Sequence, residues 1–121
     1  MTLPELITAL EAAEGPSEQL DAEISHFLHE EDFGRLDENR PSTGWHPSTP
    51  AYTASLDAAL TLVRNGFSWE VGQDITFYIS AIVCGHDVHA SAEGKTPALA
   101  LSVAALKARA SAAARELGIE L

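Results

Sequence analysis

Residues 67–93 read FSWEVGQDITFYISAIVCGHDVHASAE, and the alternation of apolar and polar side chains along them decides the fold. Such alternation is the pattern of β-strands that bury one face. Gly72 and Gly85 lie in turns that divide the stretch into three strands. The connection around Gly85 is too short for a crossover between parallel strands, so the stretch predicts an antiparallel meander.

Four helices flank this stretch, and each begins at a residue that suits a helix start. After the strands, Thr96-Pro97 combines a capping residue with a proline in the first turn. Before them, helices are expected to begin at Thr2, at Ser17, and at Thr53 or Ser55. The apolar stripes expected along these helices, in chain order, are Leu6, Ile7, Leu10 and Ala13; Leu20, Ile24, Phe27 and Leu28; Leu56, Ala59, Leu60 and Val63; and Leu99, Val103, Leu106, Ala110 and Leu117.

The element order predicts an α+β fold within a single domain, residues 1–121. A helical pair (1–32) and a loop (33–52) precede an αβββα unit (53–121). The middle strand carries apolar residues at its odd positions, but its even positions include Ile82 and Cys84, which also favour cover. We therefore expect helices against both faces of the sheet, which is an α/β/α sandwich.

The charge is strongly negative and concentrated early in the chain. There are 18 acidic and 7 basic residues, a net charge of −11. Residues 1–40 hold eleven of the acids against Arg35 and Arg40, a balance of −9. Such a surface repels the phosphates of nucleic acids and anionic membranes, and attracts basic protein surfaces.

Other features of the sequence indicate a bacterial cytoplasmic protein. No apolar run approaches the ~20 residues of a membrane span. The first residues contain glutamates and no Lys or Arg, unlike a secretory signal. Cys84 is the single cysteine, so the chain forms no internal disulfide, which suits a reducing compartment. No phosphate loop, dinucleotide fingerprint or nucleophile motif occurs, and we expect neither a cofactor nor enzymatic activity.

The acidic helical pair is the predicted partner-binding region. Carboxylates that lie outside the apolar stripes are available to dock on a basic host protein, such as a nucleic-acid-handling or defence protein. The residues predicted for this role are Glu18, Asp21, Glu23, Glu30 and Glu31. The simpler interpretation is that these side chains serve only solubility.

A second candidate site lies in the turn Cys84-Gly85-His86-Asp87-Val88-His89. Thiolate, imidazole and carboxylate are all zinc ligands, so the turn is an alternative metal site formed by Cys84, His86, Asp87 and His89. The same residues allow a Cys–His nucleophilic pair. Their spacing matches no standard zinc motif, and the simpler interpretation is an ordinary polar turn with a half-buried cysteine.

Three segments together resemble the phage α/β/α ("ABA") sandwich domain family of small phage and prophage proteins. They are residues 9–17 (ALEAAEGPS) continuing to 20–24 (LDAEI), residues 50–60 (PAYTASLDAAL) and residues 93–101 (EGKTPALAL). The resemblance implies a sandwich fold and a phage origin, and assigns no site residues. It favours a non-catalytic accessory protein that acts in the host cytoplasm.

The αβββα order is also that of double-stranded-RNA-binding domains. Those modules place basic residues at the start of the last helix, where they contact phosphates. Here that helix begins Thr96-Pro97-Ala98, with Lys95 as the nearest cation. We therefore predict that the chain does not bind nucleic acid.

Overall fold

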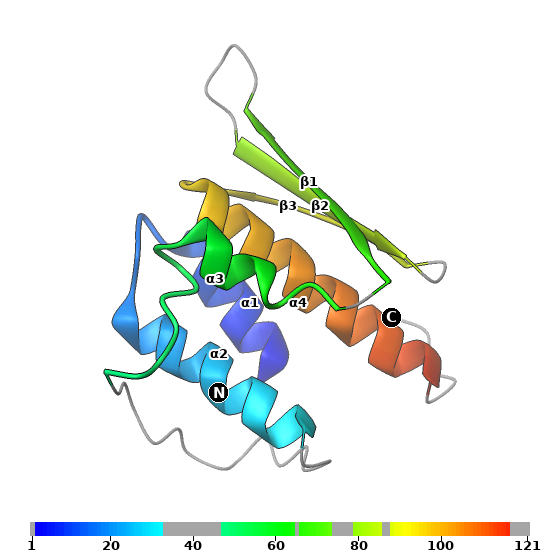
Figure 1. Ribbon diagram of the computed structural model, residues 1–121, viewed down its shortest axis with the longest axis horizontal. Coiled ribbons are helices and arrows are strands. Elements are labelled where there is room, and N and C mark those ends of the chain that lie inside the picture. The colour runs from blue at the N-terminus through cyan, green and yellow to red at the C-terminus, as the bar shows by residue number, and fades with distance from the viewer. Residues whose placement is uncertain (1, 33–46, 65, 74–78, 86–87, 117–121) are drawn as a thin grey trace.

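The computed structural model describes residues 2–32, 47–64, 66–73, 79–85 and 88–116, with side chains omitted at 29–32 and 112–116 (Figure 1). The elements in chain order are α1 (Leu3–Ala12), α2 (Glu18–Asp32), α3 (Leu56–Leu60), β1 (Ser68–Gln73), β2 (Ile79–Gly85), β3 (Val88–Gly94) and α4 (Pro97–Glu116). The predicted α+β class and element order are confirmed.

Each helix begins at a hydroxyl side chain that accepts a hydrogen bond from a backbone N–H of the first turn. Such caps satisfy amide groups that have no partner within the helix. The pairs are Thr2 with the Glu5 amide at 3.3 Å, Ser17 with Leu20 at 3.2 Å, Ser55 with Ala58 at 3.3 Å and Thr96 with Leu99 at 3.1 Å. Of the two candidates for the third helix, Ser55 is therefore the cap.

The three strands form an antiparallel sheet in the order β1-β2-β3, as the meander predicts. Gly72 was expected in a turn but lies within β1, opposite Ser80. The inward face of the sheet is apolar: Ala81 and Val83 of β2 are fully buried, and Val88, Ala90 and Ala92 of β3 are nearly so. Residues between them point outward. The alternation in the sequence thus identifies the buried face.

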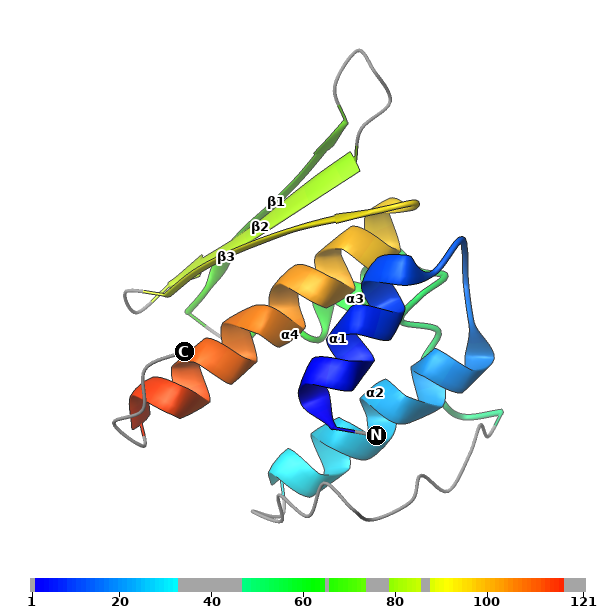
Figure 2. The same cartoon turned by 180° about the vertical axis from the view of Figure 1, so that it is seen from behind.

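Helix α4 is the central element of the molecule rather than a cover on the sheet. It contacts all three strands on one side and α1 and α3 on the other (Figures 1 and 2). Residues 98–106 are accordingly buried all round the helix, including Leu101 and Ser102, which lie outside the predicted stripe. A helix that is apolar on every face is expected in the interior, and its alanines permit close packing.

The predicted cover on both faces of the sheet is absent from the described residues. Figures 1 and 2 show α1, α3 and α4 on one side of the sheet, with α2 packed against α1 beyond them. The order of layers is therefore sheet, helices, helix, and no described element covers the outer face of the sheet. This face carries small polar side chains such as Ser80 and Ser91, which can be hydrated. Ile82 and Cys84 on the same face are half-buried.

Two glycines are required by the backbone. Gly66 has φ of 90°, a conformation that side chains disfavour, and it follows the end of α3. Gly94 ends β3 against the first turn of α4, where a Cβ atom would lie 2.7 Å from the backbone nitrogen of Ala100. The sheet and α4 meet closely at this point.

Candidate functional site

The predicted partner-binding carboxylates differ in exposure. Glu18 is exposed and Glu23 is half-buried, whereas Asp21 is only 3% exposed. The prediction for Asp21 is therefore wrong, because a buried carboxylate is not available to a partner. Glu30 and Glu31 belong to the backbone of α2, but their side chains lie outside the described residues.

Asp21 instead holds the start of α2 to the segment before α3. Its Oδ1 accepts from the backbone N–H of Thr53 at 2.8 Å and lies 2.8 Å from the Thr53 hydroxyl. The Thr53 oxygen in turn accepts from the backbone N–H of Ser17 at 2.8 Å. A buried carboxylate with two donors is stable, whereas one without them is costly. The partner of Asp21 is 32 residues away, so no local pattern in the sequence reveals it.

The exposed carboxylates of this region include residues that the sequence analysis did not select. We define the acidic surface as Glu5, Glu11, Glu14 and Glu18, all of which are exposed on α1, its end or the start of α2. Residues 2–32 contain nine acidic residues and no Lys or Arg. The charge asymmetry of the sequence therefore becomes a property of one side of the molecule, the side formed by α1 and α2 (Figure 1).

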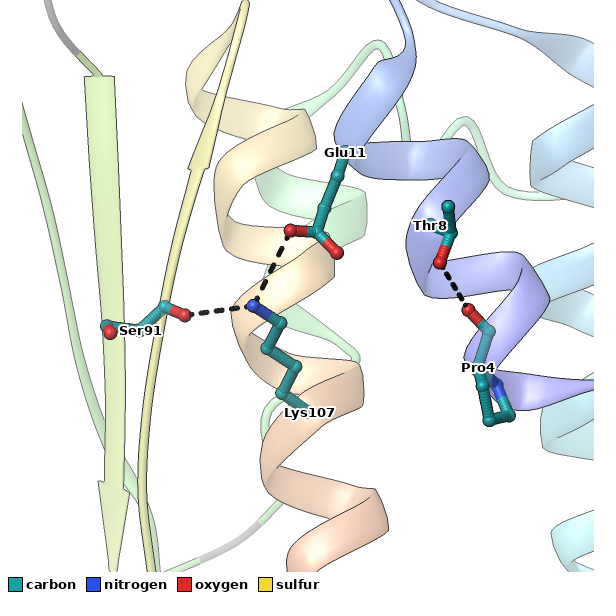
Figure 3. Close-up of polar contacts among 5 residues, drawn as sticks. All are labelled: Pro4, Thr8, Glu11, Ser91 and Lys107. Carbon is teal, nitrogen blue, oxygen red and sulfur yellow. Dashed lines mark hydrogen bonds and ion pairs between the residues drawn. The ribbon is translucent and has the colours of Figure 1, made fainter.

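A groove of about 590 Å³ lies beside the acidic surface, between α1, β3 and α4. Lys107 spans it: the ammonium group lies 3.7 Å from a carboxylate oxygen of Glu11 and donates to the carbonyl of Ser91 at 3.4 Å (Figure 3). The Thr8 hydroxyl donates to the carbonyl of Pro4 at 2.9 Å, back into its own helix (Figure 3). The lining consists of Leu3, Pro4, Ile7, Thr8, His89, Ala90, Ser91, Lys107, Ala110 and Ser111.

The groove is suited to an apolar group. The part of its lining that comes from α1 and α4 includes the apolar residues Leu3, Pro4, Ile7 and Ala110, and its lysine is already engaged by Glu11. The hydrogen bonds of Lys107 and Thr8 in this lining go to backbone carbonyls. The groove is therefore a candidate site for binding an apolar group.

The alternative metal site is described only in part. Cys84 lies opposite His89 in the β2–β3 register, so both side chains point to the open outer face of the sheet. Cys84 is half-buried and His89 is exposed. His86 and Asp87 lie outside the described residues, and within the described part no group of three His, Cys, Asp or Glu side chains is placed to hold a metal ion.

Two polar contacts on the side of α4 that faces away from the sheet were also not predicted from the sequence. The Ser102 hydroxyl donates to the carbonyl of Tyr52 at 3.1 Å, and Arg109 Nε donates to the carbonyl of Leu62 at 2.7 Å. Burial raises the pKa of the Tyr52 phenol above its usual 10.0; Arg109 lowers this pKa and Asp21 raises it. These contacts join α4 to the segments before and after α3, so we assign them to the fold.

None of the helices in the described part of the chain has both the length and the apolar character needed to cross a membrane. Comparison with protein-family models, with curated proteins and with solved structures found no match to this chain. The resemblance to the phage ABA sandwich family, which rests on the three segments quoted above, stays a prediction.

Proposed function

We propose that this chain is a small phage- or prophage-encoded accessory protein that binds a basic surface of a host protein in the bacterial cytoplasm, without catalytic activity of its own. The observation that carries this proposal is the acidic surface. Its four carboxylates are exposed in a segment, residues 2–32, that contains no Lys or Arg. The phage origin rests on the resemblance described above.

The acidic surface favours association with a cation-rich partner through the combined field of its charges. A single exposed ion pair contributes about 0.2–1 kcal/mol, so several carboxylates must act together. Their main effect is on the association rate, which complementary charge raises and salt lowers. Of the nine acidic residues in this segment, Asp21 is committed to the fold and Glu11 contacts Lys107. Glu14 and Glu18 are thus the best candidates for direct contact.

The test is affinity capture from bacterial lysate with two variants of equal charge. The first is Glu14→Gln with Glu18→Gln; the control is Asp57→Asn with Glu93→Gln, two exposed acids on other elements. Glu18 and Asp57 both lie in the first turn of a helix. The two variants therefore lose the same kind of helix-dipole stabilisation. The proposal expects a basic protein captured by the wild type and the control, lost with the first variant and released by salt. Equal capture by both variants contradicts it.

The alternative function is metal binding at the turn between β2 and β3. The observation in its favour is that Cys84 and His89 lie opposite each other on the outer face. Zinc needs two further ligands, for which His86 and Asp87 are the candidates. Metal analysis of the purified protein tests this directly. One zinc per chain, lost on Cys84→Ser, would replace the leading proposal with this one.

A further inference from the structure

We infer that β1 is a dimerisation strand, which pairs antiparallel with β1 of a second copy of this chain about a two-fold axis at Val71. This inference concerns the side of the molecule away from the acidic surface and is independent of the proposed function. Its basis is the free edge of β1, the pattern of residues along it and the distribution of charge.

No described element of the chain pairs with the outer edge of β1. In an antiparallel sheet, the N–H and C=O of alternate residues point to opposite neighbours. The carbonyl of Ser91 accepts from Lys107, so this carbonyl points away from β2. The carbonyl of Cys84 accepts from the Ser68 hydroxyl at 3.4 Å, so this carbonyl points toward β1. Carried through the register of the sheet, both contacts give the same assignment for β1. The backbone groups of Ser68, Glu70 and Gly72 point toward β2, and those of Trp69, Val71 and Gln73 point outward.

The edge has few of the features that usually prevent strands from pairing. Natural sheets blunt their edges with charged side chains, above all lysine, and with proline, bulges or a covering element. β1 contains one charged residue, Glu70, and no lysine or proline; its register with β2 has no bulge, and among the described residues its packing partners are β2 and α4. Figures 1 and 2 show this edge facing away from the helices.

The side chains of β1 select one register for self-pairing. The outward-pointing backbone groups must face each other, which leaves few symmetric arrangements. A two-fold axis at Glu70 would place the two glutamates directly opposite each other, which is destabilising. An axis at Val71 places Trp69 opposite Gln73 of the second copy and Glu70 opposite its Gly72, where there is no side chain to clash with. Each hydrogen-bonded pair can then exchange both of its N–H···O bonds.

Pairing in this register would bury the largest exposed apolar side chain in the described part of the chain. Trp69 is 45% exposed, although it lies on the same face as the fully buried Val83 opposite it. Val71, half-buried, continues this face toward the edge. A second β1 extends the face: Val71 lies opposite Val71 of the second copy at the axis, and Trp69 lies opposite Gln73 and diagonal to Val71 of that copy. A buried aromatic side chain in an interface is a common source of affinity.

The charge distribution permits this contact despite the net charge of the chain. Two chains of charge −11 repel each other, so association requires their acidic regions to stay apart. Residues 2–32 lie across α4 from the sheet (Figure 2). Pairing through β1 places these regions at the two far ends of the dimer.

The experiment measures mass against concentration by analytical ultracentrifugation, using the full chain. The wild type is expected to reach twice its 12.9 kDa mass as concentration rises, and Val71→Lys, which places two cations at the axis, is expected to remain monomeric. A wild type that stays monomeric up to about 1 mM overturns the inference, since a weaker contact has no use as an interface.

Substitutions at Gly72 test the register. A side chain there meets nothing within 4 Å in the monomer but faces Glu70 of the second copy. Gly72→Lys should lower the dimer dissociation constant, and Gly72→Glu should raise it, by about tenfold each, because symmetry places the pair twice. Gly15→Lys and Gly15→Glu make the same changes in net charge at an equally open position on the acidic side, and should alter the constant far less. If the dissociation constant changes equally for the Gly72 and Gly15 variants, or changes for neither, the proposed register is wrong.

Discussion

The two edges of the sheet differ in how they are finished. Along β3, α1 lies beside the strand and Lys107 occupies the carbonyl of Ser91 (Figure 3). Along β1, no described element pairs with the outer edge of the strand, and Trp69 is exposed. This difference indicates that α4 and β3 form the centre of the monomer, whereas β1 lies at its edge. The residues of β1 contribute less to the monomer, and are therefore available for another purpose.

The largest expected difference between the two edges is in core stability. Leu99, in the first turn of α4, is fully buried. Leu99→Ala should lower the free energy of unfolding by about 3 kcal/mol. Trp69→Ala removes more atoms but from a half-exposed site, and should cost the monomer about 1 kcal/mol. Urea unfolding at a concentration where the chain is monomeric measures both. Equal losses would show that β1 belongs to the core as fully as α4 does.

A second comparison uses one glycine from each edge strand. Gly94→Ala places a Cβ atom 2.7 Å from the backbone of Ala100, which can yield only by separating β3 from α4. We expect a loss of about 2 kcal/mol. Gly72→Ala meets nothing within 4 Å, and its effect should lie within about 0.5 kcal/mol of zero. Thermal unfolding of both variants tests this. A neutral Gly94→Ala would mean that the close contact is not needed.

Lys107 tests how the β3 edge is kept closed. Lys107→Met retains the apolar stem but removes the contacts with Glu11 and Ser91. Because the ammonium group is at the surface, the loss of stability should be only about 0.5 kcal/mol. We expect no species larger than the dimer, since α1 still lies beside β3. Higher oligomers in ultracentrifugation would show that Lys107 alone protects this edge.

The smallest effect is expected beyond α4, at Tyr52. Burial raises the pKa of its phenol, so the folded chain holds this proton more tightly than the unfolded chain. The contribution is constant below the unfolded pKa of about 10 and is lost as the pH rises through the higher folded pKa. The wild type should therefore lose more stability than Tyr52→Phe between about pH 8 and pH 11. Parallel losses in urea unfolding would contradict this.

The local features of the fold were predictable from the sequence, because each has a local cause. Thr2, Ser17 and Thr96 begin helices because their hydroxyls reach amides in the next turn. The alternation along residues 67–93 predicts which residues face the core, since successive side chains of a strand point to opposite faces.

What the sequence did not reveal depends on contacts between distant segments. Asp21 resembles any other acid on a helix until Thr53 is placed beside it. Alanine is compatible with a helix that buries one face and with a helix that is buried on all sides. The alanines of α4 therefore did not reveal that this helix lies at the centre of the molecule. The open outer face of the sheet contradicts the expectation based on Ile82 and Cys84. The groove beside Lys107 is formed by three elements and has no motif.

The link between Asp21 and Thr53 has a consequence for how the molecule opens. The amide proton of Thr53 is held by a buried carboxylate from a different helix, across 32 residues of chain. It can exchange with solvent deuterium only when the start of α2 separates from the segment before α3. Amides inside a helix can exchange by fraying of that helix alone, whereas this one reports the parting of two segments. The exchange rate of the Thr53 amide therefore reports how often the start of α2 separates from the segment before α3.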